Sequence, residues 1–486
     1  MASSPLKPVT ATHRAIAHLP YAFHWFPLAC GLFFGLALLK LGNPVTLDHV
    51  SPPPTSLNAA IFETWPFYWG VALFGGLVIW GFFCDCTIRR RHTALFFLPI
   101  AWFGWNLVSA TQTTDWALTG PTLLHFLGCL LANLLGIKLF RRFPEQRVVW
   151  FGLAIGLSFI LLGGARQHYG GLASDEAYFV ENQKRGWTEV PSRQIETFLR
   201  SGILHVDANN ELQLQEGLIA KMRKRRVFST FVYPNAFAGA IILVFPVAVW
   251  WLVRASASWP NVLRGVVLGF FGYLAFANLF WTGSRSGFLV AMILLAVSIA
   301  STIKSRWTRT MGLIIGLIVG GSLFAFQFQD YFARGARSLG ARFDYWNAAV
   351  SVAKQEPILG SGPGTFYLRY RAIKPPGAEM ARLAHNDYLQ QASDAGWPAF
   401  LFYAGFVVGS IILLRPRLND RRGAFAVWLG LLGWSIQGVS EFNLYLPASA
   451  WLAFFLFGWL HEATGPDAFH LAAGINSTSS RPPSSL

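Results

Sequence analysis

The stretch AGAIILVFPVAVWWLV at residues 238–253 and the stretch GLIIGLIVGGSLFAF at residues 312–326 contain no charged side chain. Similar runs recur along the chain, and a bilayer core takes about 20 mainly apolar residues per helix. Of the 486 residues, 53% are hydrophobic and only 13% are charged, against roughly 25% charged in an ordinary soluble domain. The sequence therefore predicts an all-α integral membrane protein.

About twelve membrane-spanning helices are expected, which makes the chain polytopic. Each is an apolar segment bounded by polar or charged residues. The expected spans cover residues 21–41, 65–84, 93–110, 121–140, 148–164, 232–253, 262–281, 286–303, 311–328, 397–414, 424–439 and 448–461.

Lys and Arg are distributed unequally between the connections, and this predicts the orientation. The short connections 42–64, 111–120 and 440–447 hold no basic residue. Because basic residues favour the cytoplasmic side, both termini are expected in the cytoplasm. The net charge of +16 is then explained by helix ends, and no nucleic-acid partner is expected. The basic connections contain Arg89, Arg90, Arg91, Lys138, Arg141, Arg142, Arg147, Arg254, Arg264, Lys304, Arg306, Arg309, Arg415, Arg417, Arg421 and Arg422.

Two connections on the outer side are unusually long, and long loops of this kind are commonly folded and functional. Segments 192–201 and 339–355 within them are expected to be helical, and the Ser- and Pro-rich tail is expected to be disordered. The resulting divisions are helices one to five in 1–164, the first long loop in 165–231, helices six to nine in 232–328, the second long loop in 329–396, helices ten to twelve in 397–464, and the tail in 465–486.

The basic segment KMRKRR at residues 221–226 stands immediately before the sixth expected span. One interpretation is a solvated surface, because long loops escape the orientation rule. The other is an anion site, since Arg suits bidentate contact with phosphate. Arg225 and Arg226 lie closest to the membrane.

Two further arginines occupy positions that need explaining. Arg285 lies in the turn WTGSRSG at 281–287, where a charge at membrane depth costs roughly 2.5–3.5 kcal/mol. It either reaches back to the interface or binds an anion. Arg342 opens an expected amphipathic helix before the Gly/Pro-rich segment PILGSGPGTF at 357–366. That segment is either a turn between loop helices or part of a ligand site, and by itself it is weak evidence.

His385 lies in the segment LAHNDYLQ at residues 383–390, near the end of the second long loop. A lone histidine is more often structural than catalytic. An imidazole above the membrane surface, with Asn386 and Asp387 as hydrogen-bonding neighbours, nevertheless suits a general base. The chain has no HExxH and no P-loop motif, so no metal and no cofactor is expected.

Taken in order, these segments resemble the O-antigen ligase/polymerase family (the Wzy-type domain), over about residues 221–396. The likeness rests on Arg226 with TF and PN at 230–235, on TGSRSG at 282–287, on Arg342 with WNAA and PILGSG, and on HNDYLQ at 385–390. The segment EFNL at 441–444 is similar to a late outer turn of that family. Tyr233 and Asp394 depart from its usual residues.

The resemblance implies a bacterial inner-membrane glycosyltransferase that acts on the periplasmic face, without a metal or nucleotide sugar. Its donor would be a glycan on undecaprenyl pyrophosphate. We expect Arg226, Arg285 and Arg342 to bind the pyrophosphate and His385 to deprotonate the acceptor, with Arg225, Asn386 and Asp387 in support. Inverting transfer in one step follows from this arrangement.

The acceptor stays open. It is a lipid A core sugar in a ligase, the end of another lipid-linked glycan in a polymerase, or a Ser or Thr hydroxyl in a protein O-glycosylating enzyme. A flippase or transporter of lipid-linked glycans also fits twelve spans, although transporters usually show internal repeats. Membrane lipids are partners in every case.

Overall fold

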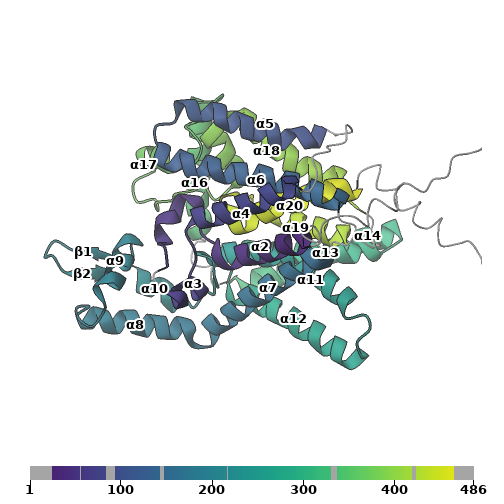
Figure 1. Cartoon of the computed structure of the whole chain (residues 1–486), viewed down its shortest axis with the longest axis horizontal. Coiled ribbons are helices and arrows are strands. Elements are labelled where there is room, and N and C mark those ends of the chain that lie inside the picture. Colours follow the sequence, from purple (N-terminus) through teal and green to yellow (C-terminus); the bar gives the residue numbers. More distant parts are fainter. Residues whose placement is uncertain are drawn as a thin grey trace, which may run out of the picture.

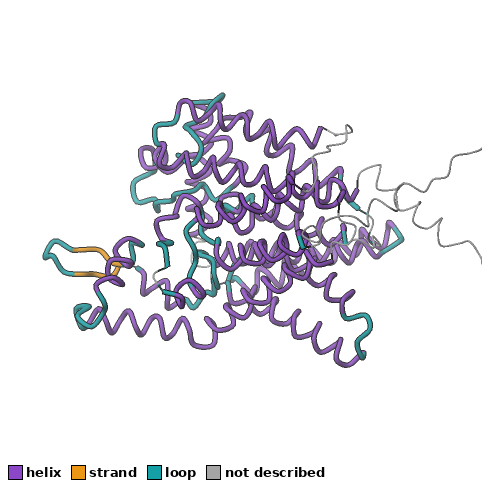
Figure 2. The backbone as a smooth tube through the Cα atoms, viewed as in Figure 1, coloured by secondary structure: helices purple, strands orange, loops and turns teal. Residues whose placement is uncertain are grey.

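The computed structural model describes residues 25–54, 56–83, 94–142, 147–215, 217–329, 337–416, 418 and 423–464. The described chain is a bundle of long helices, most of which run side by side (Figures 1 and 2). The tail at 465–486 and the basic residues at 89–91, 417, 421 and 422 lie outside the described residues.

Within the described residues, eight helices are long and apolar enough to cross a membrane. Each of the twelve expected spans overlaps one helix, so the all-α polytopic class is confirmed. The number that actually crosses a bilayer stays a prediction. The eight long helices are α5 (Ala94–Ser109), α6 (Trp116–Arg142), α7 (Arg147–Arg166), α11 (Pro234–Ala255), α12 (Asn261–Trp281), α13 (Arg285–Thr302), α14 (Arg306–Gln327) and α18 (Asp387–Leu413). The other four are α2 (Phe26–Lys40), α4 (Phe67–Phe83), α19 (Ala424–Gln437) and α20 (Pro447–Thr464).

The centre of the bundle is α20, which is buried along nearly its whole length. It packs on α6 and also contacts α2 and α11, and α7 in turn packs on both α2 and α11 (Figure 1). A Cβ at Gly136 of α6 would lie 2.0 Å from Phe455 O, and one at Gly458 of α20 would lie 2.0 Å from Asn133 O. Since helices in a membrane associate by close packing of small residues, these two glycines set the α6–α20 spacing.

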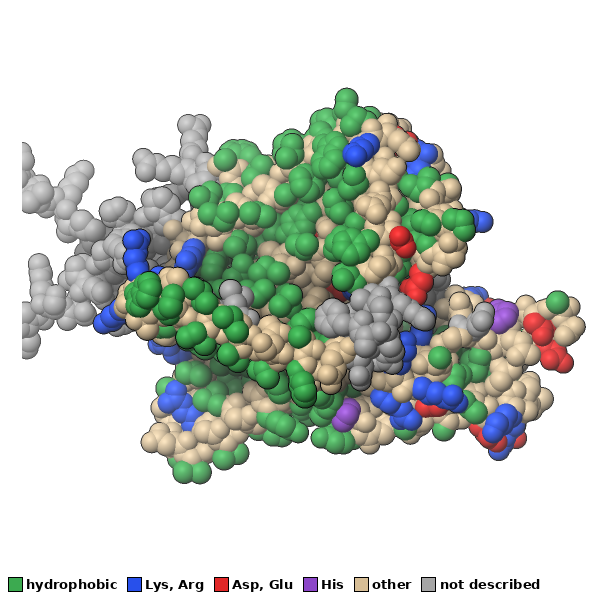
Figure 3. All heavy atoms as spheres, turned by 180° about the vertical axis from the view of Figure 1, so that it is seen from behind, with side chains coloured by type: hydrophobic (Ala, Val, Ile, Leu, Met, Phe, Trp, Pro, Cys, Tyr) green, Lys and Arg blue, Asp and Glu red, His purple; other side chains and the backbone are tan. Residues whose placement is uncertain are grey.

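The space-filling view shows how polar side chains divide between the ends of the bundle. A broad apolar surface covers its middle in Figure 3, as a lipid-facing belt requires. On the visible face, Asp and Glu gather at the right-hand end, where the long loops lie, and Lys and Arg stand at both ends. The orientation rule assigns the short connections that hold Arg254, Arg264 and Lys304 to the cytoplasm.

The first long loop is a small folded unit. Helix α7 runs into the π-helical turn η4 (Gln167–Gly171), where Tyr169 and Gly170 leave the helical conformation, and this kink marks the passage from the membrane helix into α8. Trp187, Val190 and Leu204 form its own apolar core. The expected helix at 192–201 is confirmed, whereas the hairpin of β1 and β2 was not foreseen because each strand has only three residues. The elements are α8 (Leu172–Lys184), α9 (Ser192–Arg200), β1 (Leu204–Val206), β2 (Leu212–Leu214) and α10 (Leu218–Arg223).

The two strands are antiparallel, and Leu204 pairs with Leu214. The turn between them is built by Asp207, whose Oδ1 accepts hydrogen bonds of 2.9 Å from the backbone N–H groups of Asn209 and Glu211. Asn210 has a φ of +63°, a conformation that Asn tolerates better than most residues. Asn and Asp at a tight turn are thus the sequence feature that marks this hairpin.

The second long loop contains α16 (Arg337–Gln355) and α17 (Phe366–Ile373), and the first turns of α18 complete it. Helix α18 kinks at Ala395 and Gly396, so only its second half follows the expected span 397–414. The remaining short elements are η2 (Val45–Val50), α3 (Leu57–Phe62), η3 (Ala110–Gln112) and η5 (Asn443–Tyr445).

The Gly/Pro-rich segment before α17 is a packed turn rather than a ligand cradle. The buried carboxylate of Asp394 accepts hydrogen bonds from Gly364 N at 2.9 Å and from Phe366 N at 3.1 Å. Gly360 has a φ of +64°, and a Cβ there would lie 2.5 Å from Ala395 N. The loop therefore holds α18 at its kink. This favours the first of the two interpretations of the segment, a turn between loop helices.

Candidate active site

Arg226 joins the end of the first long loop to the turn between α12 and α13. Its backbone is placed by a 3.0 Å hydrogen bond from Val227 N to Trp281 O. Its guanidinium donates from Nε to Thr282 O at 2.7 Å and from Nη2 to Asn235 Oδ1 at 2.8 Å. Burial lowers the pKa of Arg226, and the positive charge of Arg285 lowers it further. Two arginines far apart in the sequence are therefore close in space.

Arg285 is the first residue of α13. Ser284 caps that helix, because its hydroxyl accepts a hydrogen bond from Gly287 N. The Arg285 guanidinium donates from Nη1 to Ser338 Oγ at 3.1 Å, and its carbon lies 5.8 Å from the centre of the Phe328 ring. These contacts direct the side chain toward α16 and the second long loop.

Arg342 on α16 reaches the turn between α19 and α20. It donates from Nε to Ser440 O at 3.0 Å and from Nη2 to Glu441 Oε1. Its Nη1 lies 3.4 Å from Ser338 O, so Arg285 and Arg342 both contact the same serine. With its side chain only 16% exposed, Arg342 is a largely buried cation with a specific carboxylate partner.

His385 lies beside these arginines. Its backbone is in the left-handed conformation, with a φ of +50°. Its ring stacks on Tyr345 at a centroid distance of 5.7 Å and meets the edge of Phe442 at 4.8 Å. Nδ1 lies 3.4 Å from Glu441 Oε2, and Trp346 Nε1 donates to the His385 carbonyl. The side chain is 25% exposed, and no hydrogen bond to Nε2 occurs within the described residues. One ring nitrogen thus faces the carboxylate and the other is available to a substrate.

Glu441 is the centre of the site, and no role was predicted for it from the sequence. Its side chain is only 3% exposed. Oε1 accepts hydrogen bonds from Arg342 and, at 2.7 Å, from Asn235 Nδ2. Burial raises the pKa of Glu441, but the hydrogen bond from His385 and the charge of Arg342 outweigh it, so the pKa lies below its ordinary value. The signal that could have indicated a buried charge is a lone acidic residue in a short connection, 440–447, that holds no other charged side chain.

The three residues expected to support the site, Arg225, Asn386 and Asp387, each contact a different part of the protein. Arg225 pairs with Glu176 of α8 at 3.0 Å, alongside Arg223, and so belongs to the first loop. Asn386 caps α18 by accepting from the N–H groups of Tyr388 and Leu389. Within the described residues, no hydrogen bond joins Asn386 to the His385 ring; Glu441 provides that contact.

Asp387 fastens α18 to the turn between α19 and α20. Its carboxylate accepts from Leu444 N at 3.1 Å with both oxygens, and its own N–H donates to Gly438 O at 2.7 Å. Because this same turn carries Glu441, Asp387 fixes the distance between His385 and the carboxylate. Its contribution is to position the site rather than to contact a ligand.

The charges of Arg285, Arg342 and Glu441 all act on Arg226, so three guanidinium groups and one carboxylate lie within reach of one another's charge around this residue. The excess of positive charge, partly withdrawn from water, favours a multiply charged anion such as pyrophosphate. Among the described residues, no three His, Cys, Asp or Glu side chains are grouped so that they could hold a metal ion.

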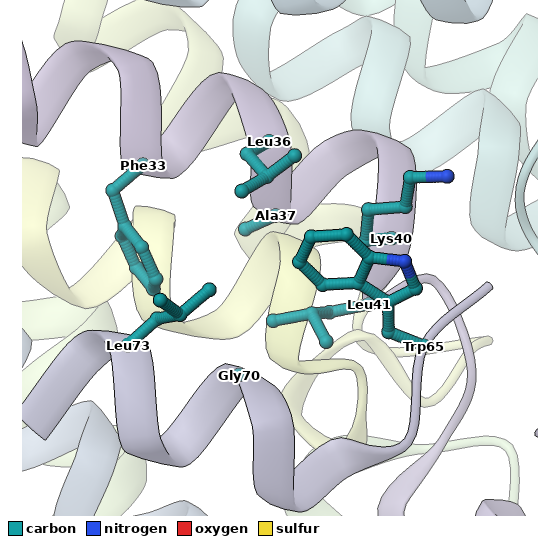
Figure 4. A pocket seen from close by; sticks show the side chains of 8 residues that line it. All are labelled: Phe33, Leu36, Ala37, Lys40, Leu41, Trp65, Gly70 and Leu73. Atoms are coloured by element: carbon teal, nitrogen blue, oxygen red, sulfur yellow. The ribbon is translucent and has the colours of Figure 1, made fainter. Parts of the chain in front are cut away.

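A small pocket between the C-terminal half of α2 and the start of α4 is separate from this cluster, because none of the cluster residues lines it (Figure 4). Its walls are apolar apart from Lys40, whose ammonium points away from the other lining side chains in Figure 4. That ammonium donates to Ile61 O at 2.5 Å and to Glu63 O at 2.9 Å. Lys40 therefore secures the connection between α2 and α4.

Part of the chain matches a known protein family. The family whose sequence model matches residues 270–404 is described as O-antigen ligase. The matched range contains Arg285, Arg342 and His385, whereas Arg226 and Glu441 lie outside it. No curated protein matches the chain. The resemblance found from the motifs is therefore confirmed over residues 270–404, which are similar to the O-antigen ligase family and lie in a chain with eight described helices long and apolar enough to cross a membrane.

Proposed function

We propose that this protein is a glycosyltransferase of the bacterial inner membrane that moves a glycan from undecaprenyl pyrophosphate to an acceptor hydroxyl on the periplasmic face. The observation that carries the proposal is the convergence of Arg226, Arg285 and Arg342 beside His385. An anion site next to an imidazole matches the two needs of such a transfer, since charge develops on the leaving group while a proton leaves the acceptor.

The three arginines act on the pyrophosphate. Arg226 and Arg342 are held by backbone carbonyls and by polar side chains, so their positive charges are already in place before the donor arrives. Donors fixed in advance stabilise charge that appears in the transition state without paying for reorganisation at that moment. As the anomeric carbon–oxygen bond breaks, its electron pair leaves with undecaprenyl pyrophosphate, and the guanidinium groups stabilise the anion.

His385 acts on the acceptor. The acceptor oxygen attacks the anomeric carbon from the face opposite the pyrophosphate, and its proton passes to Nε2 of His385. One carbon–oxygen bond forms while another breaks, so the anomeric configuration inverts and no metal takes part. A positioned general base contributes roughly 10²–10⁴-fold to the rate of such a step.

The orientation of the chain supports a periplasmic site. Both long loops, which contain α8, α9, α16 and α17, emerge at the same end of the bundle (Figure 1). The basic connections at the opposite end favour the cytoplasm, together with both termini. Under this assignment the acceptor is a lipid A core sugar, and the alternatives are the end of a second lipid-linked glycan or a protein hydroxyl.

The test uses the purified full-length protein in detergent, with an undecaprenyl-pyrophosphate-linked oligosaccharide as donor and lipid A core as acceptor. We expect His385→Ala to lower transfer at least 100-fold while detergent gel filtration and thermal unfolding stay like the wild type. His205→Ala is the matched control, because His205 is an exposed histidine of the first long loop. Near-normal transfer by His385→Ala would show that His385 is not the general base. Donor translocation in sealed vesicles without turnover in detergent would favour a flippase.

A further inference from the structure

We propose that Glu441 is the positioning residue of this site: its carboxylate fixes which nitrogen of His385 carries the proton and holds the imidazole at a set distance from the arginines. This inference rests on the proposed function, because it assigns Glu441 a role toward the proposed base. It concerns a residue outside the matched O-antigen ligase range.

The hydrogen-bond directions around Glu441 are determined by chemistry. An arginine can only donate, so Asn235 Oδ1 must accept from Arg226 Nη2, which leaves Asn235 Nδ2 to donate to Glu441 Oε1. Arg342 Nη2 also donates to that oxygen. Three residues therefore form one connected chain in which Arg226 donates to Asn235 and Asn235 donates to Glu441.

The same reasoning fixes the tautomer of His385. An ionised carboxylate only accepts hydrogen bonds, and the pKa of Glu441 is held below its ordinary value despite burial. Nδ1, which lies 3.4 Å from Oε2, must therefore carry the proton. In a neutral imidazole the other nitrogen, Nε2, then has the lone pair that a general base needs. The 3.4 Å separation is long for a hydrogen bond, and such contacts shorten when a substrate binds.

The surroundings leave Glu441 and His385 little freedom. The His385 ring is packed between Tyr345 and Phe442, and Glu441 shares its turn with Phe442. The charged groups that face Glu441 come from every neighbouring element: Arg342 from α16, Arg226 from the first long loop, His385, and the buried Asp387 from the start of α18. Asp387 is itself held by Leu444 N. Glu441 thus contacts both Arg342, one of the three proposed pyrophosphate-binding arginines, and His385, the proposed base.

The first experiment is Glu441→Gln in the transfer assay described above. Glutamine has nearly the same shape, but its amide would donate to Nδ1, which places the proton on Nε2 and removes the base. We expect kcat to fall at least 100-fold, while the KM for the donor changes less than about threefold because all three arginines remain. Glu356→Gln is the matched control, since Glu356 pairs with Arg369 on the protein surface.

The double variant His385→Ala/Glu441→Gln distinguishes positioning from a general structural effect. If Glu441 acts through His385, the double variant is no slower than His385→Ala alone, because the two residues work as one unit. If the two losses multiply, Glu441 acts independently of the histidine and the inference fails. Glu441→Asp keeps the charge but is one methylene shorter; full kcat in that variant would also overturn the inference.

A measurement on the wild-type protein keeps the inference testable even if the variants do not fold. The protein is labelled with ¹⁵N at histidine, and the His385 signals are assigned by difference from His385→Asn. We expect the neutral imidazole to carry its proton on Nδ1, and a proton on Nε2 would overturn the inference. If Glu441→Gln keeps normal kcat while His385→Ala is inactive, only the role of Glu441 fails. If His385→Ala itself is active, the proposed function fails.

Discussion

Arg342 and Glu441, which lie 99 residues apart in the chain, form a largely buried ion pair, with side chains 16% and 3% exposed. The pair joins α16 of the second long loop to the turn between α19 and α20. Removing one partner of a buried pair typically costs 3–5 kcal/mol, because the other charge is left without compensation. The pair therefore serves the fold and the proposed site together.

Arg342→Lys tests the geometry of this pair without removing its charge. A lysine offers a single nitrogen in place of the two, Nε and Nη2, with which the guanidinium reaches Ser440 O and Glu441 from different directions. We expect the KM for the lipid-linked donor to rise about tenfold, which corresponds to one charge-assisted hydrogen bond of roughly 1.5 kcal/mol. Arg369→Lys at the surface pair with Glu356 is the control. Equal donor KM values for both variants would contradict a role of Arg342 in donor binding.

Arg225 and Arg226 are adjacent in sequence but have separate partners, and their variants should differ accordingly. Arg226→Ala removes contacts to Thr282 and Asn235, and we expect transfer to fall more than 100-fold. Arg225→Ala removes only a surface pair with Glu176, which is worth about 0–1 kcal/mol, so transfer should fall less than about threefold. Initial rates of transfer at a fixed donor concentration measure both effects. Similar losses of transfer in the two variants would indicate that the segment is a diffuse basic surface.

Gly396 at the kink of α18 should not tolerate a side chain. It has a φ of +78°, and a Cβ there would lie 2.2 Å from Ile358 O. Gly396→Ala should therefore lower the yield of folded protein in detergent gel filtration. Gly377→Ala is the matched control, because Gly377 has a φ of +79° with no atom within 4 Å of the added Cβ. It should lose only about 1–2 kcal/mol from the left-handed backbone. Equal behaviour of the two variants would show that the close contact at Ile358 does not matter.

The depressed pKa of Glu441 predicts how stability depends on pH. A carboxyl whose folded pKa lies below its unfolded value, here ordinarily 4.5, stabilises the fold above that unfolded value. The stabilisation is lost as the pH falls through the folded pKa. We therefore expect the melting temperature to decrease below about pH 4.5 and to decrease less steeply in Glu441→Gln. Thermal unfolding between pH 7 and pH 3 measures both, and parallel curves would exclude Glu441 as a source of the acid sensitivity.

Much of the fold was predictable because hydropathy is a local property. Each expected span needed only its own residues, so each overlaps a helix, from α2 near residue 26 to α20 near residue 464. The kink of α18 was not predictable, since it depends on Asp394 reaching Gly364 and Phe366. The short strands β1 and β2 were missed because three residues give no periodic pattern.

For the proposed site, too, some features could be predicted from the sequence and others depended on the tertiary structure. The sequence by itself determined that Arg226, Arg285, Arg342 and His385 are unusual, because a charged or titratable group at an apolar boundary can be recognised from its immediate neighbours. Whether they meet was decided by tertiary structure alone. Hydrogen bonds between α16, α11 and the turn before α20 separate Arg226 from Arg225 and bring Glu441 to His385. Such pairings depend on how helices pack, and no single segment of the chain contains that information.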